Sequence, residues 1–130
     1  MSQVHDNIIS AYQVDFEKDM LILKTQYCNN KVCEKTTIVF TGYLTHIFEN
    51  EMKNSIIFDV EEYPLSSFYE AEHELIEKRK NYGWPIPAYD TKNDLINYLQ
   101  LNQYKAFQIR SSLGLCGWVL AKQLDIRTVE

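Results

Sequence analysis

Glycine is scarce in this chain of 130 residues, which contains only four. None of them lies in the G-x-G-x-x-G or G-x-x-x-x-G-K arrangement that holds nucleotide phosphates on backbone N–H groups, so the common nucleotide-binding enzymes are excluded. No stretch approaches the ~18 apolar residues of a membrane-spanning helix, and the polar N-terminus does not read as a signal peptide. We expect a cytoplasmic protein with no membrane partner.

Cysteine is also scarce, with Cys28, Cys33 and Cys116 as the three examples. An odd number in a chain expected in the cytosol favours free thiols. Cys28 and Cys33 have the spacing of half a zinc site, but no second pair completes the four ligands that structural zinc requires. We therefore predict free thiols and no metal or cofactor, with a disulfide between Cys28 and Cys33 as the alternative.

Catalytic pairs are missing from the sequence. A cysteine nucleophile needs a neighbouring base, and nothing pairs His46 with a thiol, while His73 lies among glutamates. Asp59 and Glu61 share one face of a predicted strand, which indicates a solvent-exposed sheet face or an acidic patch for a cationic partner. General acid–base chemistry on these carboxylates is the least favoured interpretation, and we predict that the protein is not an enzyme.

Positive charge is in deficit, since the formal net charge is −5. Residues 1–64 hold ten acids and five bases, whereas residues 65–130 hold eight of each. A direct nucleic-acid binder normally carries a basic stripe. The one basic cluster, Lys78–Lys80, falls at the end of a predicted helix, where cations offset the helix dipole. Nucleic acid is therefore not expected as a direct partner, whereas a basic protein fits.

Alternating apolar residues predict strands in the first half and at the end of the chain. On the inner face of the first and fifth strands we expect Ile8, Tyr12, Val14 and Phe16, and Ile56, Phe58 and Val60. The polar segment 28–35 is predicted to be a connection. The predicted strands are Asn7–Phe16, Met20–Tyr27, Thr36–Thr41, Tyr43–Phe48, Ser55–Glu62, Lys105–Ser111, Leu115–Lys122 and a short edge at Ile126–Val129.

Apolar spacing of three and four residues predicts two helices in the middle of the chain. The first follows Pro64, has Ser67 and Glu70 at capping-box spacing, and ends before Gly83; the second runs from Thr91 to Leu101. The predicted fold is α+β, a twisted antiparallel sheet of five to seven strands with two helices packed on one face. We expect one domain over residues 1–130.

The loop between the two helices, Tyr82-Gly-Trp-Pro-Ile-Pro-Ala-Tyr89, holds three large aromatic residues and two prolines. Prolines restrict the backbone of a loop, and Trp and Tyr dominate the binding energy of many interfaces. Two interpretations follow. Trp84 and Ile86 fold back onto the core, or Trp84 with Tyr82 forms a rigid aromatic anchor for a partner.

Five segments follow one another along the chain: the N-terminal hairpin, Glu34–Phe40, Phe58–Glu62, Tyr82–Pro85 and Gly117–Lys122. In this order they resemble a group of small uncharacterised bacterial proteins, mostly from Firmicutes. Such proteins are similar to the immunity proteins of polymorphic and contact-dependent toxin systems. Immunity proteins are small, often acidic, and bind one toxin domain, frequently a basic nuclease. The resemblance implies binding without a reaction and assigns no site residues.

The sequence therefore predicts a non-catalytic, inhibitor-like binding domain, an immunity protein for a basic toxin domain. Acidic residues would steer the partner, and buried aromatics would set the affinity. The predicted partner-binding residues are Glu49, Asp59, Glu61 and Glu62 for the charge, and Tyr82 and Trp84 for the anchor. We expect charge reversal at Asp59 and Glu61 to weaken binding to a toxin encoded beside the gene.

Two further interpretations remain open. A small-ligand-binding domain would hold its ligand in a pocket of the curved sheet lined by Tyr and Phe. An exposed edge strand at Ile126–Val129 would also allow two copies to pair across a two-fold axis as a homodimer.

Overall fold

The structure, a computed structural model, describes residues 4–129. Within them, eight strands form one antiparallel sheet in the order β4-β7-β6-β5-β1-β2-β3-β8, accompanied by three α-helices. The α+β class is confirmed, but the predicted count of five to seven strands is too low. The strands are β1 (Ile8–Asp15), β2 (Met20–Asn29), β3 (Val32–Thr41), β4 (Thr45–Glu49), β5 (Ile56–Tyr63), β6 (Lys105–Leu113), β7 (Cys116–Ala121) and β8 (Gln123–Val129). The helices are α1 (Leu65–Ala71), α2 (His73–Arg79) and α3 (Lys92–Leu101), with a 3-10 turn at Lys80–Tyr82.

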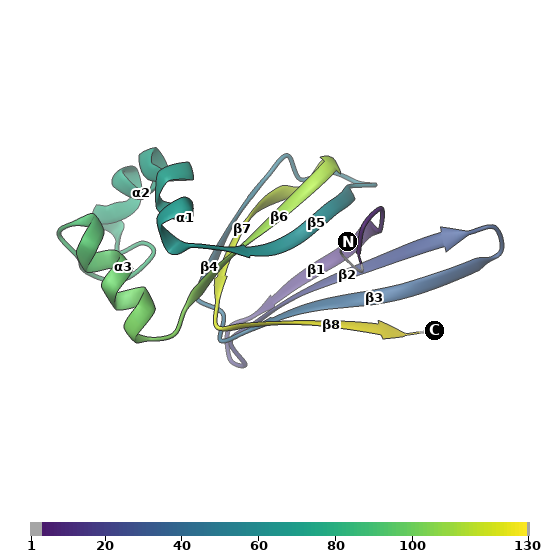
Figure 1. Ribbon diagram of the computed structural model, residues 1–130, viewed down its shortest axis with the longest axis horizontal. Helices are drawn as coiled ribbons and strands as arrows, with labels where there is room; N and C mark the ends of the chain where they lie inside the picture. The colour runs from purple at the N-terminus through teal and green to yellow at the C-terminus, as the bar shows by residue number, and fades with distance from the viewer. Residues whose placement is uncertain (1–3, 130) are drawn as a thin grey trace.

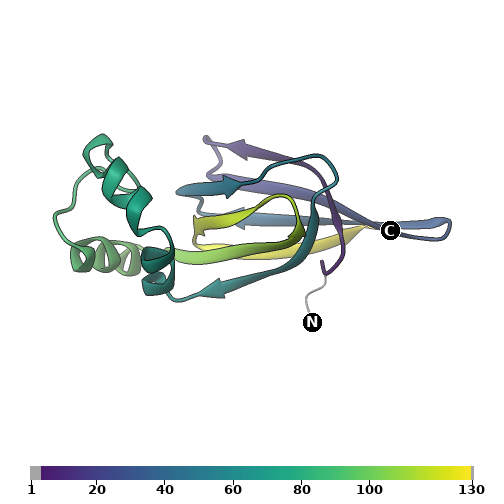
Figure 2. The same cartoon turned by 90° about the horizontal axis from the view of Figure 1, so that it is seen from above.

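The sheet folds over on itself into two layers. β1 and β5 are joined in register only at Ile8 and Ile56, so the sheet divides into a helix-side layer (β4-β7-β6-β5) and a hairpin-side layer (β1-β2-β3-β8). Their facing side chains form an inner core that contains Leu23, Phe40 and Phe107. Figures 1 and 2 show the helices at one end of the molecule and the β2–β3 hairpin extending from the other.

β7 is buried on both of its faces. Val119 and Ala121 belong to the inner core, whereas Trp118 and Leu120 belong to an outer core shared with the helices. Such burial requires an unbroken apolar run rather than an alternating one. After β7 the chain turns at Lys122, whose N–H donates to the carbonyl of Thr41 over 2.9 Å, and continues as β8 in the other layer.

Two register irregularities change which side chains point inward. In β1 the register shifts between Ile9 and Ala11, so Ile9 rather than Ile8 packs on the inner core. In β5 the register shifts around Phe58, which leaves Phe58 44% exposed. A β-bulge adds one residue and so reverses the alternation beyond it. The predicted inward positions Ile8, Phe58 and also Phe16, which is exposed beyond the end of β1, are therefore wrong.

The helical region matches its prediction in part. The second predicted helix is α3, and Thr91 forms a capping box with Asp94, since each side chain accepts from the other residue's backbone N–H. The first predicted helix divides at Glu72 into α1 and α2. Its start also differs, because Pro64 is the N-cap and no side chain caps α1.

The segment 28–35, predicted as a loop with free thiols, is instead the end of a hairpin. β2 and β3 continue through it, and Cys28 and Cys33 lie opposite each other and form a disulfide. The prediction of free thiols is therefore wrong for this pair. Cys116 is free. The strands were not predicted here because both faces of the hairpin are exposed beyond Gln26, so the segment has no alternation of apolar and polar residues.

This disulfide gives a direct prediction. Protein purified without reductant and then denatured should react with a thiol reagent at one site, Cys116, and at all three cysteines after reduction. A double Cys28→Ser, Cys33→Ser variant should give one site under both conditions. Three reactive thiols in the unreduced wild type would contradict the disulfide.

Candidate functional site

Strand register brings three of the predicted acidic residues onto one face of the helix-side layer. Side chains alternate along a strand, so every second residue shares a face. Ile47 of β4, Trp118 of β7, Gln108 of β6 and Glu61 of β5 form one row across this outer face. Glu49 comes two residues after Ile47, and Asp59 comes two residues before Glu61. Both therefore belong to the next row on the same face. Glu49, Asp59 and Glu61 therefore share the face on which the helices also pack.

Asp59 differs from the other carboxylates because it is already neutralised. It is 7% exposed, and it accepts from Arg110 Nε at 2.8 Å and Nη2 at 2.5 Å, a bidentate pair. The hydrogen bonds from Arg110 are the main reason that the pKa of Asp59 is lowered. The Arg110 guanidinium also lies over the ring of Phe58, and its Cζ is 5.1 Å from the ring centre. Asp59 is therefore a structural ion pair in the free protein.

Glu62 is separated from these residues. Successive strand residues point to opposite faces, so Glu62 lies on the reverse side of β5 from Glu61. Its carboxylate is 3.9 Å from the Lys105 ammonium. The structure thus places Glu49, Asp59 and Glu61 on one face, with β7 and β6 between Glu49 and the other two, and it leaves Glu62 at a different surface.

The aromatic loop folds back onto the helices and β4. Trp84 Nε1 donates to Thr45 Oγ1 over 2.9 Å, Arg79 lies 5.3 Å from the Trp84 ring centre, and Ile86 is fully within the outer core. The first interpretation of this loop, that Trp84 and Ile86 cover the core, is confirmed. Tyr82 behaves differently, since it is 88% exposed.

Glu49 and the aromatic loop lie toward opposite ends of β4. Thr45, which holds Trp84, and Glu49 share one face of this strand, four residues apart. At about 3.3 Å per residue their backbones are ~13 Å apart. A partner of ordinary interface size spans that distance.

A group of carboxylates that sequence reasoning did not single out surrounds Glu49. The break between α1 and α2 places Glu70, Glu72 and Glu74 beside it, and these residues line a shallow groove of about 440 Å³. We call the four residues the acidic groove. Burial raises the pKa of Glu72, and the charge of Glu49 raises it further. Lys92 neutralises Glu70 at 2.7 Å, and Lys78 also lines the groove, so four carboxylates there are accompanied by two ammonium groups.

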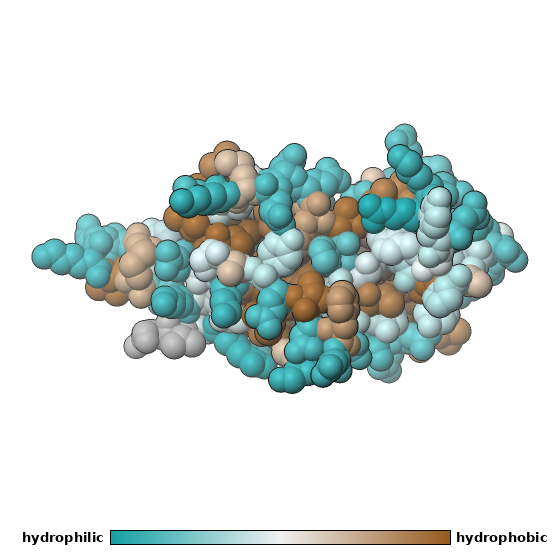
Figure 3. Space-filling view, turned by 180° about the vertical axis from the view of Figure 1, so that it is seen from behind, coloured by the Kyte–Doolittle hydropathy of each residue, from teal (hydrophilic) through white to brown (hydrophobic). Residues whose placement is uncertain are grey.

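The sequence contained one signal for this groove, the alternation Glu70-Ala-Glu-His-Glu74. On a continuous helix Glu70 and Glu74 would share a face, whereas Glu72 would lie on the opposite side of the axis. The helix breaks at Glu72, and all three residues line the same groove. The view from behind in Figure 3 shows that the helical end is covered mostly by hydrophilic side chains.

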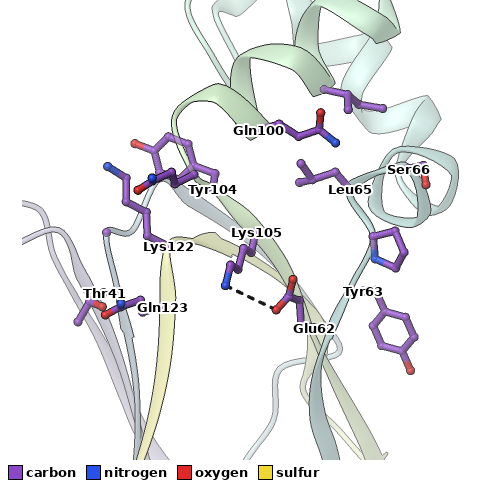
Figure 4. A pocket seen from close by; sticks show the side chains of 14 residues that line it. Thr41, Glu62, Tyr63, Leu65, Ser66, Gln100, Tyr104, Lys105, Lys122 and Gln123 are labelled. Atoms are coloured by element: carbon purple, nitrogen blue, oxygen red, sulfur yellow. Dashed lines mark ion pairs between the residues drawn. The ribbon is translucent and has the colours of Figure 1, made fainter.

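A second concavity lies where the helices meet the two sheet layers. This cleft has a volume of about 800 Å³ and is lined by the start of α1, the end of α3 and the turn between β7 and β8. Figure 4 shows Glu62 and Lys105 facing each other in it, and the stem of Lys122 beside the Tyr104 ring. The Lys122 ammonium is 5.2 Å from that ring centre. The interior of the folded sheet is filled by the inner core, so the cleft lies outside it.

The histidine and cysteine candidates lie apart. His46 points to the inner face of β4, where its Nδ1 is 2.7 Å from the hydroxyl of Tyr43, and burial lowers its pKa. Cys116 is paired with Glu49 in the β4–β7 register and therefore lies on the outer face, on the other side of the sheet from His46. Over residues 4–129 the His, Cys, Asp and Glu side chains form no cluster that could hold a metal ion. Among the described helices none is long and apolar enough to cross a membrane.

Comparisons of the chain with protein-family models, with curated proteins and with solved structures found no match.

The Asp59–Arg110 pair predicts an acid-dependent loss of stability. Asp59→Asn should lower the free energy of unfolding at neutral pH by about 1–3 kcal/mol, because Arg110 loses a charged acceptor. The pKa of Asp59 is lowered in the folded state from 3.8. The pair therefore stabilises the fold fully above that pH, and its contribution disappears as pH falls through the lowered pKa. Urea denaturation should show the difference between wild type and variant shrinking in acid.

Glu61→Gln is the matched control for this measurement, since Glu61 lies two residues away on the same face and is exposed. Its effect should stay within about 0.5 kcal/mol at every pH. Equal stabilities of the two variants at neutral pH would contradict the structural role of Asp59.

Proposed function

We propose that the protein is a non-catalytic, inhibitor-like binding domain that captures a basic protein partner, as an immunity protein captures its toxin domain. The observation that carries this proposal is the acidic groove, where Glu49, Glu72 and Glu74 lie together and where burial and the charge of Glu49 raise the pKa of Glu72. Groups held in an unfavourable electrostatic state are typical of functional sites. A cationic side chain placed in the groove would relieve the repulsion.

Electrostatics and apolar contact would have separate roles in this complex. The groove would speed association by attracting a basic surface, an effect that falls with ionic strength. Tyr82, with its fully accessible ring, would supply rigid contact area. Trp84 would act indirectly, because its packing against Thr45 fixes the loop that presents Tyr82. The resemblance to immunity proteins supports the same class of partner.

Charge reversal in the groove tests the proposal. Glu49→Lys combined with Glu74→Lys should weaken binding to the basic protein encoded beside the gene by about tenfold or more. The loss should fall mainly on the association rate and should shrink at high salt. Biolayer interferometry at low and high ionic strength gives both quantities.

The control is a double Glu17→Lys, Glu34→Lys variant, which changes the net charge equally at exposed positions outside the groove. It should bind nearly as the wild type does. If both double variants lose affinity equally, net charge rather than the groove attracts the partner, and the proposed site is wrong.

A second candidate function is favoured by the 800 Å³ cleft, whose size is within the range of small-molecule sites. Glu62, Lys105 and Lys122 offer one carboxylate and two ammonium groups. A small ligand with both an amine and a carboxylate, such as a free amino acid, would complement them. The ligand would occupy the seam between helices and sheet rather than a pocket inside the curved sheet.

A thermal-shift screen of free amino acids tests this second function. A ligand that binds the folded state raises the unfolding temperature with concentration, and Lys122→Ala should abolish the shift by removing one ammonium group. Lys31→Ala, at the exposed hairpin tip, should leave the shift unchanged. No shift with any amino acid, or an unchanged shift in Lys122→Ala, would exclude this site.

A further inference from the structure

The outer edge of β8 is an unprotected strand edge. β8 is the last strand of the sheet order, and among residues 4–129 it pairs only with β3. Its seven residues contain no proline, and their register with β3 runs from Lys35–Val129 to Thr41–Gln123 without a shift. Natural edge strands are usually shortened, bulged or interrupted by proline to prevent pairing with another chain. β8 shows none of these three devices.

The opposite edge of the sheet differs. β4 has five residues, and the indole of Trp84 is bonded to the side chain of Thr45 at its start. β8 is therefore the longer of the two terminal strands.

The charges on β8 are self-complementary. Asp125 and Arg127 share the outward face, with side chains 54% and 61% exposed, and Arg127 Nε is 2.7 Å from Asp125 Oδ2. Charged residues on an edge normally discourage self-association because they repel their own copies. Here the acid Asp125 and the base Arg127 lie two residues apart. In an antiparallel pair of copies, Asp125 of each copy can therefore face Arg127 of the other.

The alternation of β8 selects one register. When two copies pair antiparallel and continue the same two faces, opposed residues share a face. A two-fold axis at Ile126 places Asp125 opposite the partner's Arg127, and it does so twice. An axis at Asp125 would oppose two aspartates, and an axis at Arg127 would oppose two arginines. Like charges directly opposite each other are unfavourable, so only the first register satisfies both charges.

We propose that two copies of this chain associate through β8, antiparallel and centred on Ile126, so that the sheets of the two copies join. Side chains at Ile126 then meet across the axis on the inner face, and two Asp125–Arg127 pairs form on the outer face. One strand pair is a small interface, so the dimer exchanges with monomer at micromolar concentrations.

The proposed dimer interface and the acidic groove have no residue in common. β8 ends the hairpin-side layer, whereas the groove is formed by β4, α1 and α2 at the other end of the strand order. The proposal therefore does not rest on the proposed binding function. A dimer would carry two grooves.

Charge swapping tests the register by sedimentation equilibrium of the full chain. D125R and R127D should each raise the dimer dissociation constant by about tenfold or more, because each opposes like charges twice. The two variants change net charge in opposite directions, so an effect of net charge would move them apart. The double variant D125R/R127D restores opposite charges and should return within about threefold of wild type. A monomeric wild type, or a double variant as weak as the single ones, would overturn the proposal.

Cross-linking identifies the axis directly, on a Cys116→Ser background. Opposed residues in an antiparallel pair have Cα atoms ~4.5–5.5 Å apart, which fits a disulfide. Under mild oxidation, D125C and R127C should cross-link when mixed, and neither should cross-link alone. Cross-linking of either variant alone would place the axis at that residue, and no cross-linking in the mixture would exclude β8 pairing; both results overturn the proposed register.

Discussion

Burial of β7 on both faces is the constraint on which the rest of the structure depends. Its last four residues, Trp118 to Ala121, alternate between two cores, so each core must be covered by a different part of the chain. The hairpin-side layer covers one face and the helices cover the other. Burying four consecutive side chains contributes about 1.5–3 kcal/mol for each large apolar one. The fold therefore has three layers, the hairpin-side strands, the helix-side strands and the helices, with β7 in the middle layer. Charged residues lie on the part of the outer face that the helices do not cover.

The sequence predicted the fold class and most of the elements because their patterns are local. The Thr91–Asp94 cap and the apolar repeat after it placed α3 almost to the residue. Errors arose where one residue changed the phase. The shifts near Ile9 and Phe58 reverse the alternation, and neither Gly nor Pro marks them. The disulfide hairpin was missed since two exposed faces carry no apolar alternation.

The part of the candidate site that could be predicted is the part that depends on the alternation of side chains along a strand. Asp59 and Glu61 were expected on one face and lie on one face. The sequence could not show that Arg110, 51 residues away, neutralises Asp59. Nor could it show that a break at Glu72 gathers Glu70 and Glu74 around Glu49, because such breaks depend on how both helices pack on the sheet. Long-range pairing, rather than local propensity, decides which carboxylates are free to act.

The order of strands in the sheet also bears on how the chain is completed during synthesis. β4 and β5 share a layer with β6 and β7, and β1 to β3 share the other layer with β8. Neither end of the chain therefore contains a whole layer. A nascent chain that has reached α3 lacks β6 and β7, which contribute side chains to both cores, and β8, which packs against the inner one. Neither core is complete until these last strands have been made.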